Sequence, residues 1–170
     1  YYDIDNAALK LAYCGDPTCS SGNSVVTVDS GPGVGSATAL ALCIGGKPII
    51  AYRDATNGDL KVVQCGDVTC SNGNSSVTVD SNGDVGYQPS LRLNATGSPS
   101  ISYYDRTNQD LKLVHCGNAD CSSNNSIVTV DSNGDAGAFS SLALDGNGYP
   151  LISYSNNGHL LVAHCSDVTC

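Results

Sequence analysis

The chain has 170 residues, of which 7 are basic and 16 acidic, and its formal net charge is -9. Every acidic residue is Asp, and Glu, Met and Trp are absent, a composition that favours strands and turns and excludes a helical bundle or a coiled coil. The negative charge argues against nucleic acid as a partner, and no apolar run approaches the length that membrane insertion needs. Because the sequence opens without Met or a signal peptide, we expect a mature or excised piece of a protein.

A unit of 51 residues recurs along the chain. The segment Tyr52–Cys65 matches Tyr103–Cys116 and, with two residues fewer, Tyr154–Cys165. The repeat predicts a partial unit at residues 1–19 and full units at 20–70, 71–121 and 122–170. Residues 1–19 repeat the content of residues 154–170.

Each full unit contains four strand-like runs separated by turns rich in Gly, Asn and Asp. In chain order, the runs and their copies are Val25–Asp29 (with Val77–Asp80 and Ile127–Asp131), Ala39–Cys43 (with Ser90–Asn94 and Ser141–Asp145), Pro48–Tyr52 (with Pro99–Tyr103 and Pro150–Tyr154) and Leu60–Cys65 (with Leu111–Cys116, Leu160–Cys165 and, in the partial unit, Leu9–Cys14). The connections are too short for crossover helices, so the strands should pair antiparallel.

Four short antiparallel strands in about 40–50 residues are typical of a β-propeller blade. We therefore predict an all-β fold, a β-propeller-like array of four-stranded antiparallel blades. The alternative is a β-solenoid, in which each unit would form two coils.

The run at residues 141–154, SLALDGNGYPLISY, resembles the strand–DxxG–strand core of blades in the NHL and sialidase-type propeller families. The whole unit, with its pattern YYD…N.DLK…CG…C, is similar to tandem arrays in secreted bacterial proteins. The resemblance implies a propeller architecture and says little about activity. The sialidase Asp-box, S-x-D-x-G-x-T-W, is not present, and neither is the Glu that sialidase active sites use.

The strand order of those families implies that the run at Ala39 is innermost in its blade and the run at Val77 outermost. The chain would then supply a partial blade, two complete blades and a last blade without its outer strand. Val25–Asp29 could complete the last blade, but Leu9–Cys14 would then be surplus, and three blades are fewer than a closed propeller usually has. We therefore expect either a segment of a longer array or a homo-oligomer or filament that forms through strand edges.

Eight of the nine cysteines fall in four pairs with the spacing C-x-x-x-x-C. The pairs are Cys14 with Cys19, Cys65 with Cys70, Cys116 with Cys121, and Cys165 with Cys170. This spacing does not match the knuckles of zinc sites, so we predict four local disulfides and an extracellular or cell-surface location. Cys43 is unpaired, and we interpret it as a buried thiol, with an intermolecular link as the alternative.

Two segments place three oxygen-bearing side chains at alternate positions, as the start of a calcium-binding loop does. The residues are Asp80, Asn82 and Asp84, and Asp131, Asn133 and Asp135. No Gly directly follows the third ligand and no Glu stands at the twelfth position, so a turn explains the pattern better than a metal site. We expect no cofactor, with calcium as the alternative.

Tyrosines recur beside aspartates and arginines, and such groups could bind a sugar through an aromatic face and planar hydrogen-bonding partners. The candidate sugar-binding residues are Tyr52, Asp54, Tyr103, Asp105, Arg106 and Tyr154. The alternative is that these tyrosines lie in the core or between blades with satisfied hydroxyl groups. Candidate glycosylation sites are Asn74, Asn94 and Asn124, each in an Asn-x-Ser/Thr sequon.

His115 and His164 each precede a Cys at a strand end, and His159 lies in a turn. No Ser, Cys or His lies in a catalytic motif such as G-x-S-x-G, so we expect no enzymatic activity. The leading hypothesis is a secreted structural or adhesive repeat module that associates with itself in a cell-surface or filamentous assembly. The alternatives are a lectin-like, carbohydrate-binding propeller and a hydrolase whose catalytic residues lie outside this piece.

Overall fold

A computed structural model describes residues 1–170 as fourteen strands without a helix. The strands are β1 (Tyr2–Asp3), β2 (Ala8–Tyr13), β3 (Ser24–Ser30), β4 (Val34–Leu42), β5 (Pro48–Asp54), β6 (Asp59–Gln64), β7 (Ser75–Asp80), β8 (Tyr87–Leu93), β9 (Pro99–Asp105), β10 (Asp110–His115), β11 (Ser126–Asp131), β12 (Ala136–Leu144), β13 (Pro150–Asn156) and β14 (His159–His164). The structure offers no helix with the length and hydrophobicity that crossing a bilayer requires.

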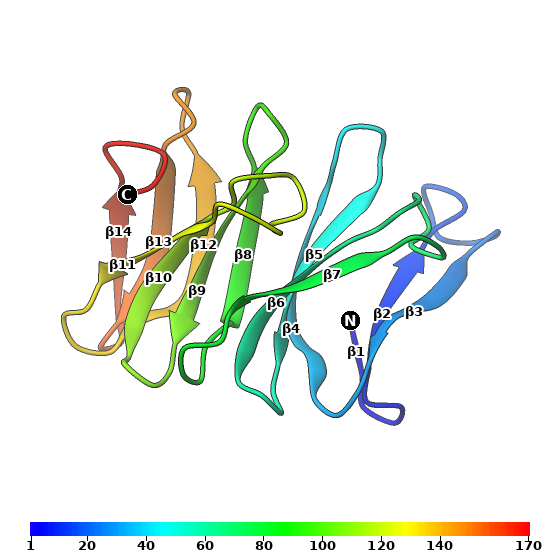
Figure 1. Ribbon diagram of the computed structural model, residues 1–170, viewed down its shortest axis with the longest axis horizontal. Helices are drawn as coiled ribbons and strands as arrows, with labels where there is room; N and C mark the ends of the chain where they lie inside the picture. Colours follow the sequence, from blue (N-terminus) through cyan, green and yellow to red (C-terminus); the bar gives the residue numbers. More distant parts are fainter.

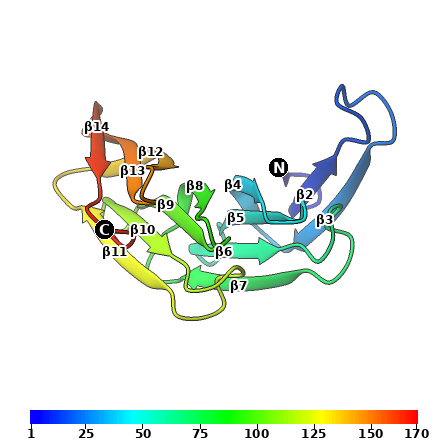
Figure 2. The same ribbon diagram turned by 90° about the horizontal axis from the view of Figure 1, so that it is seen from above.

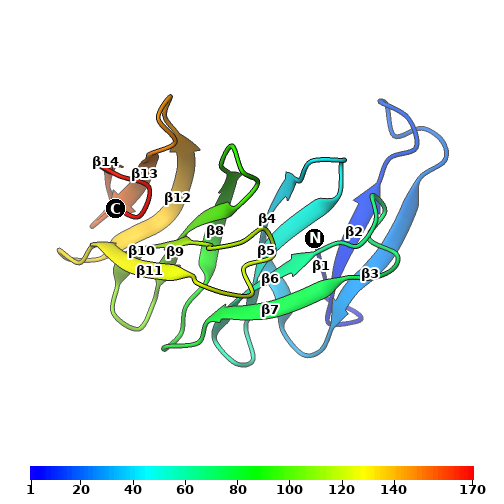
Figure 3. The same ribbon diagram turned by 45° about the horizontal axis from the view of Figure 1, so that its top comes forward.

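The strands form four antiparallel sheets, which we call A to D in chain order: β1-β2-β3, β4-β5-β6-β7, β8-β9-β10-β11 and β12-β13-β14. Figure 1 shows the sheets in a row, and Figure 2 shows that the row follows an arc. Strands β4, β8 and β12 lie on the concave side, whereas β3, β7 and β11 follow one another along the other side (Figure 3). The predicted all-β array of antiparallel blades is confirmed.

Sheets B and C have four strands, and sheets A and D have three. In sheet A the outer strand β3 pairs with β2 along its whole length, from Ala8 opposite Ser30 to Tyr13 opposite Ser24. The suggestion that residues 25–29 complete the last sheet of the same chain is therefore wrong, because β14 has only β13 as a neighbour. The two ends of the arc are incomplete in different ways.

A hydrophobic cluster fills each joint, by which we mean the contact between two consecutive sheets. The buried members are, in the A/B joint, Leu9, Val34, Ile50, Tyr52 and Val63; in the B/C joint, Ile49, Leu60, Val62, Leu91, Ile101 and Tyr103 among others; and in the C/D joint, Leu111, Leu113, Ala136, Leu142, Ile152 and Tyr154. Because sheet B packs on both faces, β5 is buried at all seven positions and its sequence does not alternate.

The inner strands begin three to five residues earlier than the sequence patterns predicted. β8 starts at Tyr87 and β12 at Ala136, and in each the pairing with the next strand shifts register over the first few residues. A glycine at the beginning of each strand, Gly86 or Gly137, lets the backbone approach the previous sheet. A Cβ on Gly86 would lie 2.9 Å from Cα of Leu60, and one on Gly137 would lie 2.7 Å from Cα of Leu111.

Candidate functional site

The recurring tyrosines, aspartates and lysines meet at the joints between sheets. At the B/C joint the Tyr103 hydroxyl donates a hydrogen bond of 2.6 Å to Asp80, and Lys112 Nζ donates one of 2.9 Å to the same oxygen. Tyr103 is fully buried and Asp80 is only 6% exposed. Since Asp80 ends β7 of sheet B and its partners lie in sheet C, the three side chains hold the two sheets together.

The A/B joint repeats this arrangement, and the C/D joint changes it. Asp29 accepts hydrogen bonds from the Tyr52 hydroxyl at 2.6 Å and from Lys61 Nζ at 2.9 Å. Asp131 accepts one from the Tyr154 hydroxyl at 2.8 Å and one from Asn156 Nδ2 at 3.0 Å. The residue opposite Tyr154 in the ladder, where the other joints have lysine, is Leu161. The C/D joint therefore has the acid without its cation.

At each joint, burial and hydrogen bonding shift the pKa values of the tyrosine and the aspartate in opposite directions. Burial alone would raise the pKa of Asp80, but the hydrogen bonds from Tyr103 and Lys112 outweigh it and hold this pKa below its usual value. Burial, followed by the bond to Asp80, raises the pKa of Tyr103 far above its usual value. The same causes raise the pKa of Tyr154 to about 12. At neutral pH the tyrosine keeps its proton and the aspartate its charge, so the pair serves as a fixed link.

Most of the candidate sugar-binding residues are enclosed. Tyr52 and Tyr103 are fully buried and Tyr154 is 5% exposed, so none of them offers a ring face to a sugar. Asp54 and Asp105 are also buried, and each accepts hydrogen bonds from the backbone of the turn that follows it. The sugar-binding interpretation is wrong for these five residues, because packing between sheets uses the rings and turn formation uses the acids.

Arg106, the sixth candidate, is exposed and belongs to a cluster that includes Tyr87 and Asp84. Its Nη1 lies 2.9 Å from the Tyr87 hydroxyl and 3.9 Å from Asp84 Oδ2. Arg53 forms an ion pair with Asp84 and places its guanidinium carbon 3.9 Å from the centre of the Tyr87 ring. The ring of Tyr104 meets that of Tyr87 edge-on, with 6.3 Å between centroids. We call these five residues the arginine–tyrosine cluster.

A polar cavity of about 420 Å³ lies beside this cluster. It is lined by Arg53, Thr56, Asn57, Ser81 and Asp84, together with Ala55 and backbone of Gly58 and Gly83. Arg53 is 7% exposed, and its buried Nε has no hydrogen-bond partner. At the C/D joint Tyr104 occupies the position equivalent to Arg53, and its hydroxyl donates a hydrogen bond of 2.7 Å to Asp135. Sequence reasoning missed the cluster because it considered Asp84 only as part of a turn or, alternatively, as a calcium ligand.

The calcium candidates point toward different partners. Asp80 and Asp131 face the joint tyrosines, whereas Asp84 and Asp135 face Arg53 and Tyr104. Asn82 and Asn133 contribute backbone N–H groups to Asp80 and Asp131, at 3.0 Å in both cases. No group of three or more His, Cys or acidic side chains is placed to hold a metal ion.

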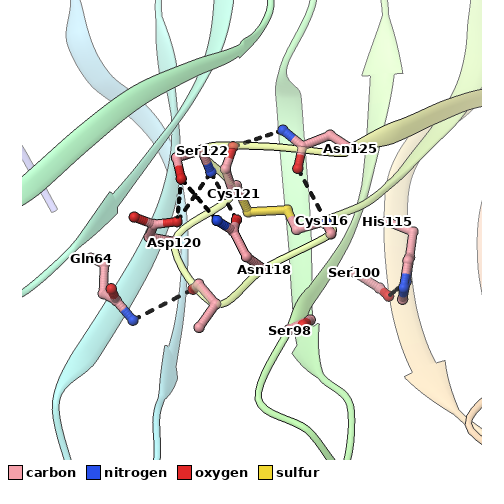
Figure 4. The surroundings of a disulfide bond; sticks show 12 residues. Gln64, Ser98, Ser100, His115, Cys116, Asn118, Asp120, Cys121, Ser122 and Asn125 are labelled. Carbon is pink, nitrogen blue, oxygen red and sulfur yellow. Dashed lines mark hydrogen bonds between the residues drawn. A yellow bond between two sulfur atoms is a disulfide. The ribbon is translucent and has the colours of Figure 1, made fainter.

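The four disulfides join the predicted cysteine pairs, with Cα atoms 4.7–4.8 Å apart. In the first three loops an asparagine forms hydrogen bonds across the base of the loop. In the loop of Cys116 and Cys121 (Figure 4), Asn125 accepts a hydrogen bond from Gly117 N–H at 3.3 Å and donates one to the Cys121 carbonyl at 2.7 Å. Gln64 of sheet B reaches this loop through the carbonyl of Ala119 at 3.5 Å. The loop therefore packs back over the preceding sheet.

The three sequons differ in their surroundings. Asn74 ties the second disulfide loop in the way that Asn125 ties the third. Asn94 accepts three hydrogen bonds within its own turn, from Thr96 and Ser98. Asn124 is exposed and makes no such tie. Of the three side chains, Asn124 is the one that could carry a glycan without loss of a structural hydrogen bond.

Cys43 and the histidines complete the set of reactive side chains. Cys43 is half-buried, forms no disulfide and packs against the cluster of the B/C joint, which agrees with a thiol of the core. His115 Nδ1 lies 3.1 Å from Ser100 Oγ, but Ser100 is 2% exposed and cannot be reached by a substrate. His164 lies 3.1 Å from Asp145 in sheet D. Models of known protein families give no match to the sequence, and curated proteins give none either.

Proposed function

We propose that the chain is an extracellular structural or adhesive repeat module that associates with itself as part of a cell-surface or filamentous assembly. One observation carries the proposal. The polar residues that recur from unit to unit are used inside the protein, to join one sheet to the next, as Asp80, Tyr103 and Lys112 do. A repeat whose shared chemistry joins sheet to sheet is suited to building an array.

Two further features support this function. Four disulfides favour an oxidising, extracellular environment, where small domains use such bridges for stability. The edge strand β14 presents unpaired backbone groups and exposed apolar side chains, including Leu160 at 79% exposure. Exposed edges of this kind template pairing with another chain.

The mass of the native particle in solution tests the proposal. We expect a particle heavier than the 17.3 kDa chain, measured by light scattering and viewed by electron microscopy, and no binding on a glycan array. A monomer at all concentrations would contradict self-association.

Carbohydrate binding is a second candidate because of the arginine–tyrosine cluster and its polar cavity. Arg106 is exposed and Tyr87 is half-buried beside the cavity, and the cavity lining offers both hydrogen-bond donors and acceptors. If this function holds, Arg106→Ala should abolish binding on the glycan array. Arg92→Ala is the matched control, because Arg92 is also exposed but bonds only the carbonyl of Leu91.

A further inference from the structure

Sheet D exposes a face that the repeat buries elsewhere. Leu160 and Val162 of β14 are 79% and 61% exposed. Their counterparts in sheet C, Leu111 and Leu113, are fully buried in the cluster to which Ala136 at the start of β12 belongs. Strand β14 also lacks the outer strand that β6 and β10 have.

Sheet A has the opposite deficit, because its inner half is missing. Strand β1 pairs with Ala8 and Leu9, and Tyr1 forms two backbone hydrogen bonds with Lys10, so only residues 11–13 of β2 have no neighbour on that side. The N–H groups of Cys65 and Cys116 donate to the carbonyls of the strands beside them, whereas no such bond forms at Cys14.

An apolar groove runs beside this open edge. It encloses about 230 Å³ and is lined mostly by hydrophobic residues, among them Leu11, Tyr13, Leu40 and Leu42. Leu40 is 48% exposed, whereas its counterpart Leu91 is 1% exposed between sheets B and C. An open strand edge beside an apolar groove is the arrangement that accepts an added strand.

The charges at the two ends are complementary. Lys10 occupies in β2 the place that Lys61 holds in β6, but no aspartate from a preceding sheet reaches it, and it pairs with Asp3 of its own turn. At the other end Asp131 has no lysine, since Leu161 stands in that place.

We propose that two copies of this chain exchange strands between sheets A and D and close a ring of six blades. This inference rests on the proposed self-association and names its partner as a second copy. In each mixed sheet, β12 and β13 come from one copy and β2 and β3 from the other. Strand β14 and the two-residue β1 are displaced, and β2 takes the place of β14, whose sequence it repeats.

The exchange supplies the lysine, the outer strand and the cover of the groove that the two ends lack, and Leu9 takes the place of the exposed Leu160. Lys10 comes to lie opposite Tyr154 of the partner copy, as Lys112 lies opposite Tyr103 within sheet C, and so reaches Asp131. The mixed sheet gains β3 as its outer strand. The face of β12 and β13 then covers Leu40 and the groove beside it.

The number of sheets selects two copies. Sheets A and D lie at opposite ends of the arc (Figure 2), so one copy cannot exchange strands with itself. Each copy contributes two complete sheets and half of two mixed ones, which amounts to three blades. Closed propellers have about four to eight blades. Two copies of residues 1–170 give six blades, which lies within this range, whereas one copy gives three and three copies give nine.

A cross-link tests the exchange directly. In the register of β13 with β14, Leu151 lies opposite His164, whose place Tyr13 would take. With Cys43→Ser to remove the free thiol, the double variant Tyr13→Cys and Leu151→Cys should form a disulfide between copies, visible as a dimer on a nonreducing gel. Tyr13→Cys with Phe139→Cys is the matched control and should form none, because Phe139 is exposed but lies away from β2 in the ring.

Light scattering on the unmodified chain completes the test, with twice 17.3 kDa as the expected mass. A heavier, open-ended particle that still cross-links overturns the closed ring. A particle heavier than the monomer that does not cross-link overturns strand exchange but leaves the proposed self-association standing. A monomer overturns both.

Substitutions at Lys10 and at the equivalent residue Leu161 test whether the lysine drives the exchange. Leu161→Lys gives β14 its own partner for Asp131, so it should raise the dimer dissociation constant about tenfold, as a gained charge-assisted hydrogen bond would. Leu161→Met is the control and should leave the constant unchanged. Lys10→Leu should weaken the dimer from the other side. An unchanged constant in both lysine variants overturns the proposal.

Discussion

Gln88 and Phe139 hold the same position in consecutive repeats, and Gln88 Oε1 accepts a hydrogen bond of 2.6 Å from the backbone N–H of Phe139. Both residues adopt left-handed backbone conformations, with φ of 49° and 57°. A few residues further on, Leu142 N–H donates to Ser90 Oγ at 3.0 Å. Side chains of β8 thus bind the backbone of β12, and they connect the concave edges of sheets C and D.

Phe139→Gly should stabilise the protein. Phe139 is 74% exposed, so little burial is lost, and glycine relieves a left-handed conformation that costs an ordinary residue about 1–2 kcal/mol. After the entropy cost of glycine, we expect a gain of about 0.5–1 kcal/mol in urea unfolding. Phe139→Ala keeps the conformational cost and should show no gain. Equal stability of the two variants would contradict the strain argument.

The presence of a lysine at a joint should determine how much the aspartate of that joint contributes to the free energy of unfolding. Asp80→Asn leaves Lys112 buried with only Asp105, at 3.7 Å, and should cost about 3–5 kcal/mol. In the monomeric chain, Asp131→Asn leaves no buried cation and should cost about 1–2 kcal/mol, the loss of ordinary hydrogen bonds. Thermal unfolding of the two variants measures the difference. Equal costs would show that the lysine adds nothing to the joint.

The joint aspartates should make the protein sensitive to acid. Hydrogen bonds from the joint tyrosines and lysines outweigh burial and hold the pKa values of Asp29 and Asp80 below the usual 3.8. A lowered pKa in the folded state stabilises above the unfolded pKa, and this stability is lost as the pH falls through the folded value. The free energy of unfolding should therefore fall from about pH 5 downward.

Burial, and then a neighbouring acid, raise the pKa values of Asp59 and Asp110. These two residues therefore partly oppose the loss of stability at low pH. Denaturant titrations across this pH range measure the slope. Asp80→Asn should flatten it, and a slope that is unchanged in this variant would assign the acid sensitivity to other groups.

Exposure should set the order in which the disulfides are reduced. Cys14 and Cys19 are both exposed, whereas Cys65 is 1% and Cys70 1% exposed, and Cys116 and Cys121 are similarly buried. A mild reductant followed by alkylation and mass spectrometry should therefore label the first bridge before the second and third. Labelling of all bridges at one rate would indicate that global unfolding controls access.

The sequence predicts the strands, their antiparallel pairing and the disulfides because each depends on neighbours along the chain. Alternation, turn residues and the four-residue spacing between cysteines are all local signals. The hydrogen-bond partners of Asp80 lie 23 and 32 residues away along the chain. No local sequence pattern therefore distinguishes an aspartate that binds calcium from one that links two sheets. The tyrosines were ambiguous for a related reason, since an aromatic residue beside an acid fits a sugar site and a joint equally well. The early start of β8 was missed because a residue such as Gln88, with positive φ inside a strand, has no signature in sequence.

Each disulfide joins residues only five positions apart, so no bridge passes from one sheet to another. Under tension along the chain, the load between sheets falls on noncovalent contacts alone: hydrogen bonds, ion pairs and apolar packing. The joints can then open in succession, and each repeat that unravels releases about 170 Å of extended chain, while its bridge withholds only a short loop. A protein built in this way would absorb mechanical work in successive steps of similar length and would re-form each joint once the force is removed.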